Sequence, residues 1–156
     1  MEDGAKAASN AAEIAQHCHY IGLCVRDDND VDNLLYGEQG MLEHASAGSL
    51  IAIHSTVTQA SLLRWASDAA AKDIHLIDAP MTGGASGADA GTLCYMVGGK
   101  AAEIEQCRPY LNTSAAKIIH AGELGAGIAL KLCNNLITYT QFTAMSEATR
   151  LAEACG

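Results

Sequence analysis

Short apolar runs that alternate with helical patterns constrain the fold of this chain more than any other feature of its sequence. The runs that suit buried strands span residues 19–25, 49–55, 74–80, 91–99 and 116–122. Helical patterns cover residues 11–17, 28–35, 58–71 and 100–111, and a long one without proline runs from about Gly125 to the end. Strands that alternate with helices predict an α/β fold with a largely parallel sheet covered by helices.

Helix starts are expected at polar residues that can cap them. Asp28 or Asn29 is a candidate cap for the second helix, and Ser55 or Thr56 is a candidate for the third, because their side chains can accept from free backbone N–H groups. The first helical pattern is rich in alanine, whereas the last is long for a globular domain.

The composition of the chain limits the classes of partner that it is expected to bind. With 156 residues, of which 49% are apolar, the chain is long enough for one domain with a sizeable core. Its net charge of -9 argues against nucleic acid, which requires clustered lysine and arginine. No apolar run approaches the length of a membrane span, so no membrane partner is expected.

Cysteine usage and the first residues indicate an intracellular protein. None of the six cysteines forms a Cys-x-x-Cys pair, so we expect them to be reduced. The start, MEDGAKAASN, lacks the apolar segment of a secretory signal. His17, Cys18 and His19 are adjacent and point in different directions, so no metal site is expected there.

The segment DAPMTGGASGADAGTLCYMVGG, residues 78–99, is unusually rich in glycine. It follows the apolar run 74–80, so MTGG is expected at the carboxyl edge of the sheet, where α/β proteins bind ligands. Successive N–H groups in a glycine turn form a small anion-binding concavity, to which the hydroxyl of Thr82 adds a donor. The alternative is a tight connection that binds nothing.

A lysine in the long helical segment is the second candidate. In GAGIALKLCNN, residues 125–135, Lys131 shares a helix face with Asn135 and lies beside Asn134. The surrounding residues are apolar, and burial lowers the proton affinity of a lysine, which suits it to acid–base chemistry. The alternative is a lysine whose stem packs on apolar neighbours while its amine stays in water.

Taken together, these segments resemble the β-hydroxyacid dehydrogenases, which include 3-hydroxyisobutyrate dehydrogenase and tartronate semialdehyde reductase and are related to 6-phosphogluconate dehydrogenase. Residues 78–99 look like the family's substrate-binding segment, GELGAGIALKLCNN matches its Gly-x-Gly-x-x-x-Lys-x-x-Asn-Asn segment, and HSTV at 54–57 resembles its cofactor-side turn. The resemblance implies a truncated NAD(P)-binding Rossmann-type domain at residues 1–122, with a doubly wound sheet. Residues 123–156 would then be the start of a helical C-terminal domain, reduced to its long interdomain helix.

The resemblance also implies an activity, hydride transfer between NAD or NADP and a short hydroxy acid or semialdehyde. Lys131 would be the general acid and base, Asn135 would position the substrate, and residues 82–84 (Thr82, Gly83 and Gly84) would hold its carboxylate. Cys24, Val25 and Thr56 would lie along the cofactor. The helix would join chains into a homo-oligomer through residues that need a partner surface: Ile128, Leu132, Leu136, Phe142, Met145 and Leu151.

The sequence departs from the family at both ends. It lacks the Gly-x-Gly-x-x-Gly turn that supports a cofactor pyrophosphate, and it stops after the interdomain helix, so it is expected to be a fragment. The alternative function is therefore an inactive remnant that acts only as an interaction module. Among other residues, we expect Trp65 to be a packing residue, His75 to be structural and Asp78 to bond to nearby backbone.

Overall fold

The computed structural model describes residues 4–156 and contains a six-stranded sheet. Its strands are β1 (Tyr20–Leu23), β2 (Leu50–Ile53), β3 (His75–Asp78), β4 (Met81–Thr82), β5 (Leu93–Gly98) and β6 (Ala115–Gly122). The order is β1-β2-β3-β5-β4, with β6 also paired to β5. β1, β2 and β3 are parallel, and so are β5 and β6, whereas β5 runs antiparallel to β3 and β4. The predicted α/β class and largely parallel sheet are confirmed.

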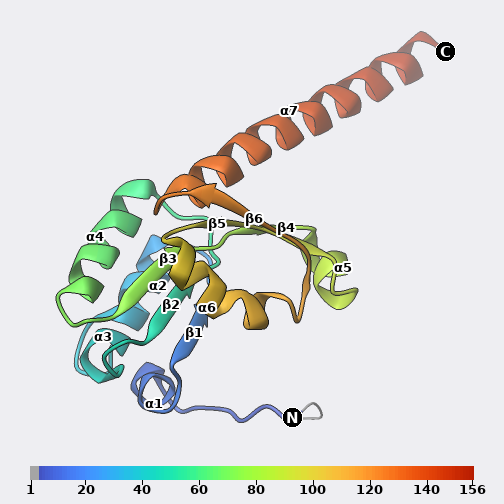
Figure 1. The fold of residues 1–156 in the computed structure, drawn as a ribbon. Helices are drawn as coiled ribbons and strands as arrows, with labels where there is room; N and C mark the ends of the chain where they lie inside the picture. Colours follow the sequence, from blue (N-terminus) through green and yellow to red (C-terminus); the bar gives the residue numbers. More distant parts are fainter. Residues whose placement is uncertain (1–3) are drawn as a thin grey trace.

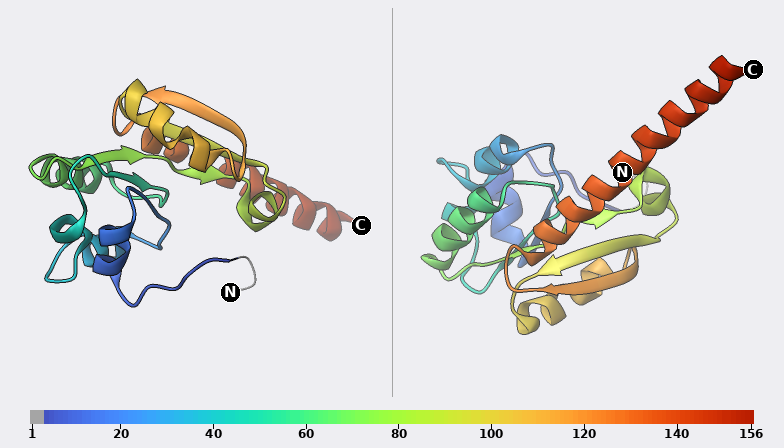
Figure 2. Two further views of the ribbon diagram at one scale, coloured as in Figure 1. Left: turned by 60° about the horizontal axis from the view of Figure 1, so that its bottom comes forward. Right: turned by 90° about the horizontal axis from the view of Figure 1, so that it is seen from above.

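Helices cover both faces of this sheet. They are α1 (Ala11–His17), α2 (Asp28–Leu35), α3 (Met41–His44), α4 (Gln59–Ala70), α5 (Gly84–Asp89), α6 (Ala101–Leu111) and α7 (Ala126–Cys155). α6 and α7 lie on opposite sides of β5, as the two views of Figure 2 show. All four residues of β2 are buried, as expected for a parallel strand covered on both faces.

Two helices begin one or more residues away from the expected caps. Asp27, rather than Asp28 or Asn29, caps α2 and accepts from the N–H of Asp30 at 3.1 Å. Thr58, rather than Ser55 or Thr56, caps α4. The hydroxyl of Ser55 is engaged elsewhere, since it bonds to both backbone groups of Val25, and the helix therefore starts later.

Three short elements were not predicted: α3, β4 and α5. Each has too few residues to show an apolar period, and α5 contains two glycines, Gly84 and Gly87. α5 therefore follows the glycine turn before the next strand begins.

Two apolar clusters, one on each face, hold the layers together. One lies between the sheet and α2, α3 and α4 and includes Trp65, which is fully buried and donates its indole N–H to Asp32, so its packing role is confirmed. The other lies under α6 and includes Ile77 and Val97.

The long helix α7 projects away from the body for much of its length (Figure 1). Ile128 in its first turn is fully buried within this chain. The expectation that Ile128 needs the surface of a partner chain is therefore wrong. Further along, Leu136, Phe142 and Met145 are 71%, 73% and 69% exposed. Among the described residues, no helix combines the length and apolar character needed to cross a bilayer.

Candidate functional site

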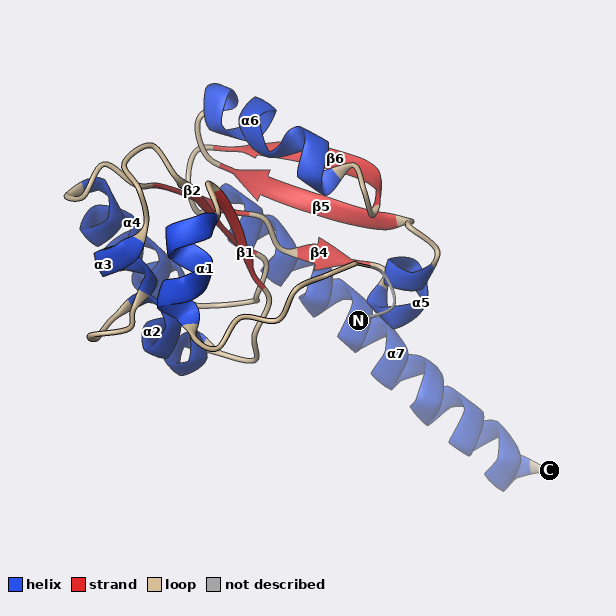
Figure 3. Cartoon of the chain, turned by 90° about the horizontal axis from the view of Figure 1, so that it is seen from below, coloured by secondary structure: helices blue, strands red, loops and turns tan. Residues whose placement is uncertain are grey.

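The glycine segment turns sharply at the edge of the sheet. After Pro80 the chain forms β4, which pairs with β5 so that Thr82 lies opposite Cys94 (Figure 3). Gly83 and Gly84 then have φ values of 130° and 64°, and α5 begins. These angles favour glycine strongly, and at Gly83 a Cβ would also approach the side chain of Leu93 to 3.1 Å. The turn therefore requires both glycines.

Backbone donors gather at this turn. Gly83 is the N-terminal cap of α5 and has no side chain with which to cap it. The first N–H groups of a helix have no partner within the helix, and they carry a partial positive charge. The turn thus offers polar hydrogens beside the hydroxyl of Thr82.

A cavity of about 330 Å³ lies between this turn and α7. Its lining residues are Met81, Thr82, Gly83, Gly84, Ala88 and Leu93 from the glycine segment and β5, and Lys131, Asn134, Asn135, Thr138 and Tyr139 from α7. The five residues predicted for substrate and catalysis thus meet in one cavity although its two walls are about 50 positions apart in sequence.

Lys131 is the one cationic residue that residues 4–156 contribute to this lining. It is half-buried, and burial lowers the pKa of its amine, in the direction expected from its apolar neighbours. Thr138 and Tyr139 were not predicted. They follow Lys131 by seven and eight positions, two helical turns, so the same periodicity that groups Lys131 with Asn135 would have found them.

The residues expected beside the cofactor lie elsewhere on the sheet. Cys24 and Val25 follow β1 and line a separate hollow of about 310 Å³ beside that edge strand. Val25 donates its N–H to the Ser55 hydroxyl at 2.7 Å, which ties the ends of β1 and β2 together. Thr56 is exposed just beyond β2 and lines neither this hollow nor the cavity between the glycine turn and α7.

Asp78 joins the sheet to the start of α7. Its carboxylate is fully buried and accepts from the N–H of Gly125 at 2.8 Å and of Ile128 at 2.7 Å. Burial raises the pKa of this carboxyl, and the N–H bonds offset part of that rise. The expectation that Asp78 bonds to backbone is confirmed, but its partners are not local, since they are 47 and 50 residues away in sequence. They come close because α7 packs across β3 and β5.

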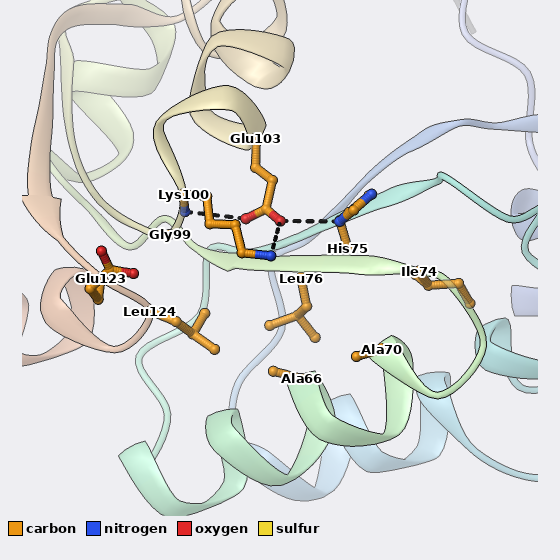
Figure 4. Close-up of a pocket in the computed structure, with 10 residues that line it drawn as sticks. All are labelled: Ala66, Ala70, Ile74, His75, Leu76, Gly99, Lys100, Glu103, Glu123 and Leu124. Atoms are coloured by element: carbon orange, nitrogen blue, oxygen red, sulfur yellow. Dashed lines mark hydrogen bonds and ion pairs between the residues drawn. The ribbon is translucent and has the colours of Figure 1, made fainter.

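A second cavity, of about 170 Å³, lies against the beginning of β3 rather than its end. Figure 4 shows the carboxylate of Glu103 directed toward His75 and Lys100. It accepts from Nδ1 of His75 at 3.1 Å and from the N–H of Lys100, the cap residue of α6, at 3.2 Å. His75 therefore links β3 to α6, in keeping with its expected structural role.

A mostly parallel sheet that is covered by helices on both faces places the chain among the doubly wound α/β folds. Within that class, the family model of the NAD binding domain of 6-phosphogluconate dehydrogenase matches residues 1–122. The chain belongs to this family. Of the two cofactors expected from the sequence, NAD is confirmed at the level of the family.

Relatives agree with this assignment. The chain is 37% identical over its whole length to 2-(hydroxymethyl)glutarate dehydrogenase of Eubacterium barkeri, of which it covers 52%. It superposes on a protein from Mycobacterium avium 104 described as an oxidoreductase with a TM-score of 0.91 and 40% identity, covering 99% of this chain and 55% of that one.

A Mycobacterium tuberculosis 3-hydroxyisobutyrate dehydrogenase with L-serine gives a TM-score of 0.84 at 31% identity, over 96% of this chain and 50% of that one. The resemblance to the 3-hydroxyisobutyrate dehydrogenase group is thereby confirmed. The chain spans about half the length of the curated relatives it matches.

Proposed function

We propose that this chain carries the substrate-binding and proton-transfer half of an NAD(P)-dependent oxidoreductase of the β-hydroxyacid dehydrogenase type. One observation carries the proposal. A half-buried lysine with a lowered pKa faces the same cavity as a glycine turn rich in backbone donors. A cation and an anion-binding turn across one small cavity suit a short molecule with a carboxylate at one end and a hydroxyl or aldehyde near the other.

In this proposal the glycine turn holds the carboxylate. Thr82 donates its hydroxyl, and the N–H groups that follow Gly83 add donors, because the first N–H groups of α5 have no partner within the helix and no side chain caps them. L-Serine and 2-(hydroxymethyl)glutarate, which the names of two relatives mention, both carry a carboxylate and a hydroxyl. The cavity volume suits molecules of this small size.

Lys131 would transfer the proton at the substrate oxygen. A lowered pKa increases the fraction of neutral amine at a given pH, so Lys131 can accept a proton when an alcohol is oxidised and return it when an aldehyde is reduced. Asn135 lies one turn further along the helix and would hold the same oxygen or its neighbour by hydrogen bonding.

The ends of β1 and β2 would receive the cofactor. NAD or NADP would supply or take the hydride, and Cys24, Val25 and Thr56 would contact it, because strand ends at this edge are where such sheets bind dinucleotides. Cys24 and Thr56 are exposed there, which fits that role. Within residues 4–156, no strand-to-helix turn has the Gly-x-Gly-x-x-Gly spacing, so the residues present fit only part of the cofactor. The boundary between a cofactor domain at 1–122 and a helical segment at 123–156 belongs to the same proposal.

Cofactor and substrate binding test the proposal. Fluorescence titration with NADH and NADPH is expected to saturate at micromolar concentrations in the wild type and in Lys131→Ala, because that lysine serves the substrate. Oxidation of 3-hydroxyisobutyrate, L-serine and 2-(hydroxymethyl)glutarate is expected to be lost in Lys131→Ala and kept in Lys117→Ala, which alters an exposed lysine on β6. Absence of binding at millimolar cofactor would contradict the proposal for this chain.

A second candidate is an interaction module without catalysis. The observation that favours it is the row of large apolar side chains left exposed on α7, such as Leu136 and Phe142. Soluble proteins seldom expose such a surface unless a partner covers it. We propose a second copy of the chain as this partner. Self-association without cofactor binding would favour the module over the enzyme.

A further inference from the structure

The long helix α7 has no cap of its own. Its cap position is Gly125, with a φ of 93° and no side chain. The first N–H groups of a helix need acceptors, and leaving them unpaired in the protein interior is costly. Glycine at this position leaves that task to another part of the chain.

Asp78 caps α7 from the end of β3. In a capping box, the cap side chain accepts from the third helical N–H while a second side chain accepts from the N–H of the cap residue. Here a single carboxylate does both, because Oδ1 accepts from Gly125 at 2.8 Å and Oδ2 from Ile128 at 2.7 Å. The start of α7 is therefore fixed to the sheet by two charge-assisted hydrogen bonds.

Two glycines permit this close approach. A Cβ on Gly98 of β5 would collide with Oδ1 of Asp78, and one on Gly127 would collide with the carbonyl oxygen of Met96. Because neither residue has a side chain, the first turn of α7 rests directly on the backbone of β5. The helix therefore has little freedom to shift where it meets the sheet.

We propose that Asp78 is a positioning residue whose carboxylate sets the place of Lys131 in the cavity through the start of α7. Lys131 lies three residues after Ile128, about 4.5 Å further along the helix axis, so any tilt of the first turn displaces it. This inference rests on the proposed role of Lys131 in proton transfer. The new element is the part played by the sheet. β3 carries Asp78 and leads into the glycine turn, so it aligns Lys131 with that turn.

The effect is expected to act through position rather than charge. Burial is the cause that lowers the pKa of Lys131. Removing one bond of Asp78 would let the first turn move off β5 and expose the amine to water.

The test compares Asp78→Asn with Ile77→Val. Asparagine keeps one acceptor oxygen but presents an NH₂ group to the second helix N–H, so one of the two bonds is replaced by two donors that face each other. Ile77 is fully buried at the preceding position of β3 and belongs to the apolar cluster under α6, not to the cluster that contains Ile128. Its truncation therefore weakens the fold without removing a bond to α7.

Two measurements report on the start of α7 and on the surroundings of Lys131. Amide hydrogen exchange of Gly125 and Ile128 is expected to be at least about tenfold faster in Asp78→Asn. NMR titration of the chain with carbon-13-methylated lysines, with Lys131 assigned through Lys131→Arg, is expected to show its pKa rising toward the ordinary value. Ile77→Val is expected to leave the pKa of Lys131 unchanged.

A second variant keeps the test decisive if Asp78→Asn does not fold. Gly127→Ala keeps the Asp78 carboxylate, but its Cβ would collide with the carbonyl oxygen of Met96 and with Oδ2 of Asp78. It therefore pushes the first turn away from the sheet and is expected to raise the pKa of Lys131 as well. An unchanged Lys131 in the variant that folds, or an equal change in Ile77→Val, would overturn the proposal. Neither readout uses substrate or cofactor, so a failure of the proposed enzymatic function would show separately, in the binding titrations.

Discussion

The two ends of α7 differ in burial and in the contacts that hold them. Its first turn is buried, capped by Asp78 and packed on β5, with Ile128 inaccessible to solvent. Its later turns leave the body, and Leu136, Phe142 and Met145 are mostly exposed there. Lys131 lies at the transition, half-buried, where the helix passes over the glycine turn.

This difference separates what the chain supplies by itself from what a partner would supply. The first turn of α7 is held by the sheet and packed as in a protein interior. The free end carries large exposed apolar side chains, and an extended exposed apolar surface marks a place where another molecule binds. Substitutions at the two ends should therefore change different properties.

The largest expected effect is on folding stability. Ile128→Ala removes a buried side chain from the first turn and is expected to lower the free energy of unfolding by about 2–5 kcal/mol. Ile137→Ala, at 58% exposure on the same helix, is expected to change it by less than about 0.5 kcal/mol. Chemical denaturation of both variants measures the contrast. Equal losses would show that the two ends are packed alike.

The second effect is on self-association. Phe142→Glu places a charge in the exposed apolar surface and is expected to weaken association of the chain about tenfold or more, with folding stability kept. Gln141→Glu adds the same charge without removing an apolar group and serves as the control. Sedimentation across a range of concentrations measures this. A wild type that stays monomeric throughout would refute the proposed oligomer.

The smallest effect is on the pH dependence of stability. The folded-state pKa of Lys131 is lowered from 10.5, so between the two values the unfolded chain binds more protons than the folded chain. The contribution of Lys131 to the free energy of unfolding should therefore rise with pH across that window, whereas Cys107 and Tyr36, whose pKa values burial raises, contribute in the opposite direction. Lys131→Met should lose this rise, whereas Lys117→Met, on exposed β6, should keep it. Denaturation at several alkaline pH values compares the slopes, and identical slopes in all three proteins would argue against a buried amine.

Local sequence patterns were sufficient for the main elements and for the cavity. Apolar runs between turn signals identified the strands from β1 to β6 except β4, and a lysine in an apolar helix together with a glycine turn identified the two walls of the cavity. These features work at short range, because alternation and helical spacing are set by neighbouring residues.

Contacts between segments that are distant in sequence could not be predicted from such local patterns. Nothing near Asp78 in sequence indicates that its carboxylate caps a helix 47 residues later. A signal did exist at the other end, since Gly125 cannot cap α7 and some other acceptor had to do so. The starts of α2 and α4 were misplaced for a related reason, because several polar residues compete for each cap and packing selects one of them.

The most direct test of the proposed substrate site is a nitrogen-15 NMR titration of the full chain with 3-hydroxyisobutyrate, with and without NADH. We expect saturable shifts of the amides of Thr82, Gly83 and Gly84 and of residues around Lys131, the two walls of the cavity. We also expect Thr82→Val to weaken this binding, because the hydroxyl donor is lost. Shifts confined to other surfaces, or no shifts at millimolar concentrations, would contradict the assignment of this cavity as the substrate site.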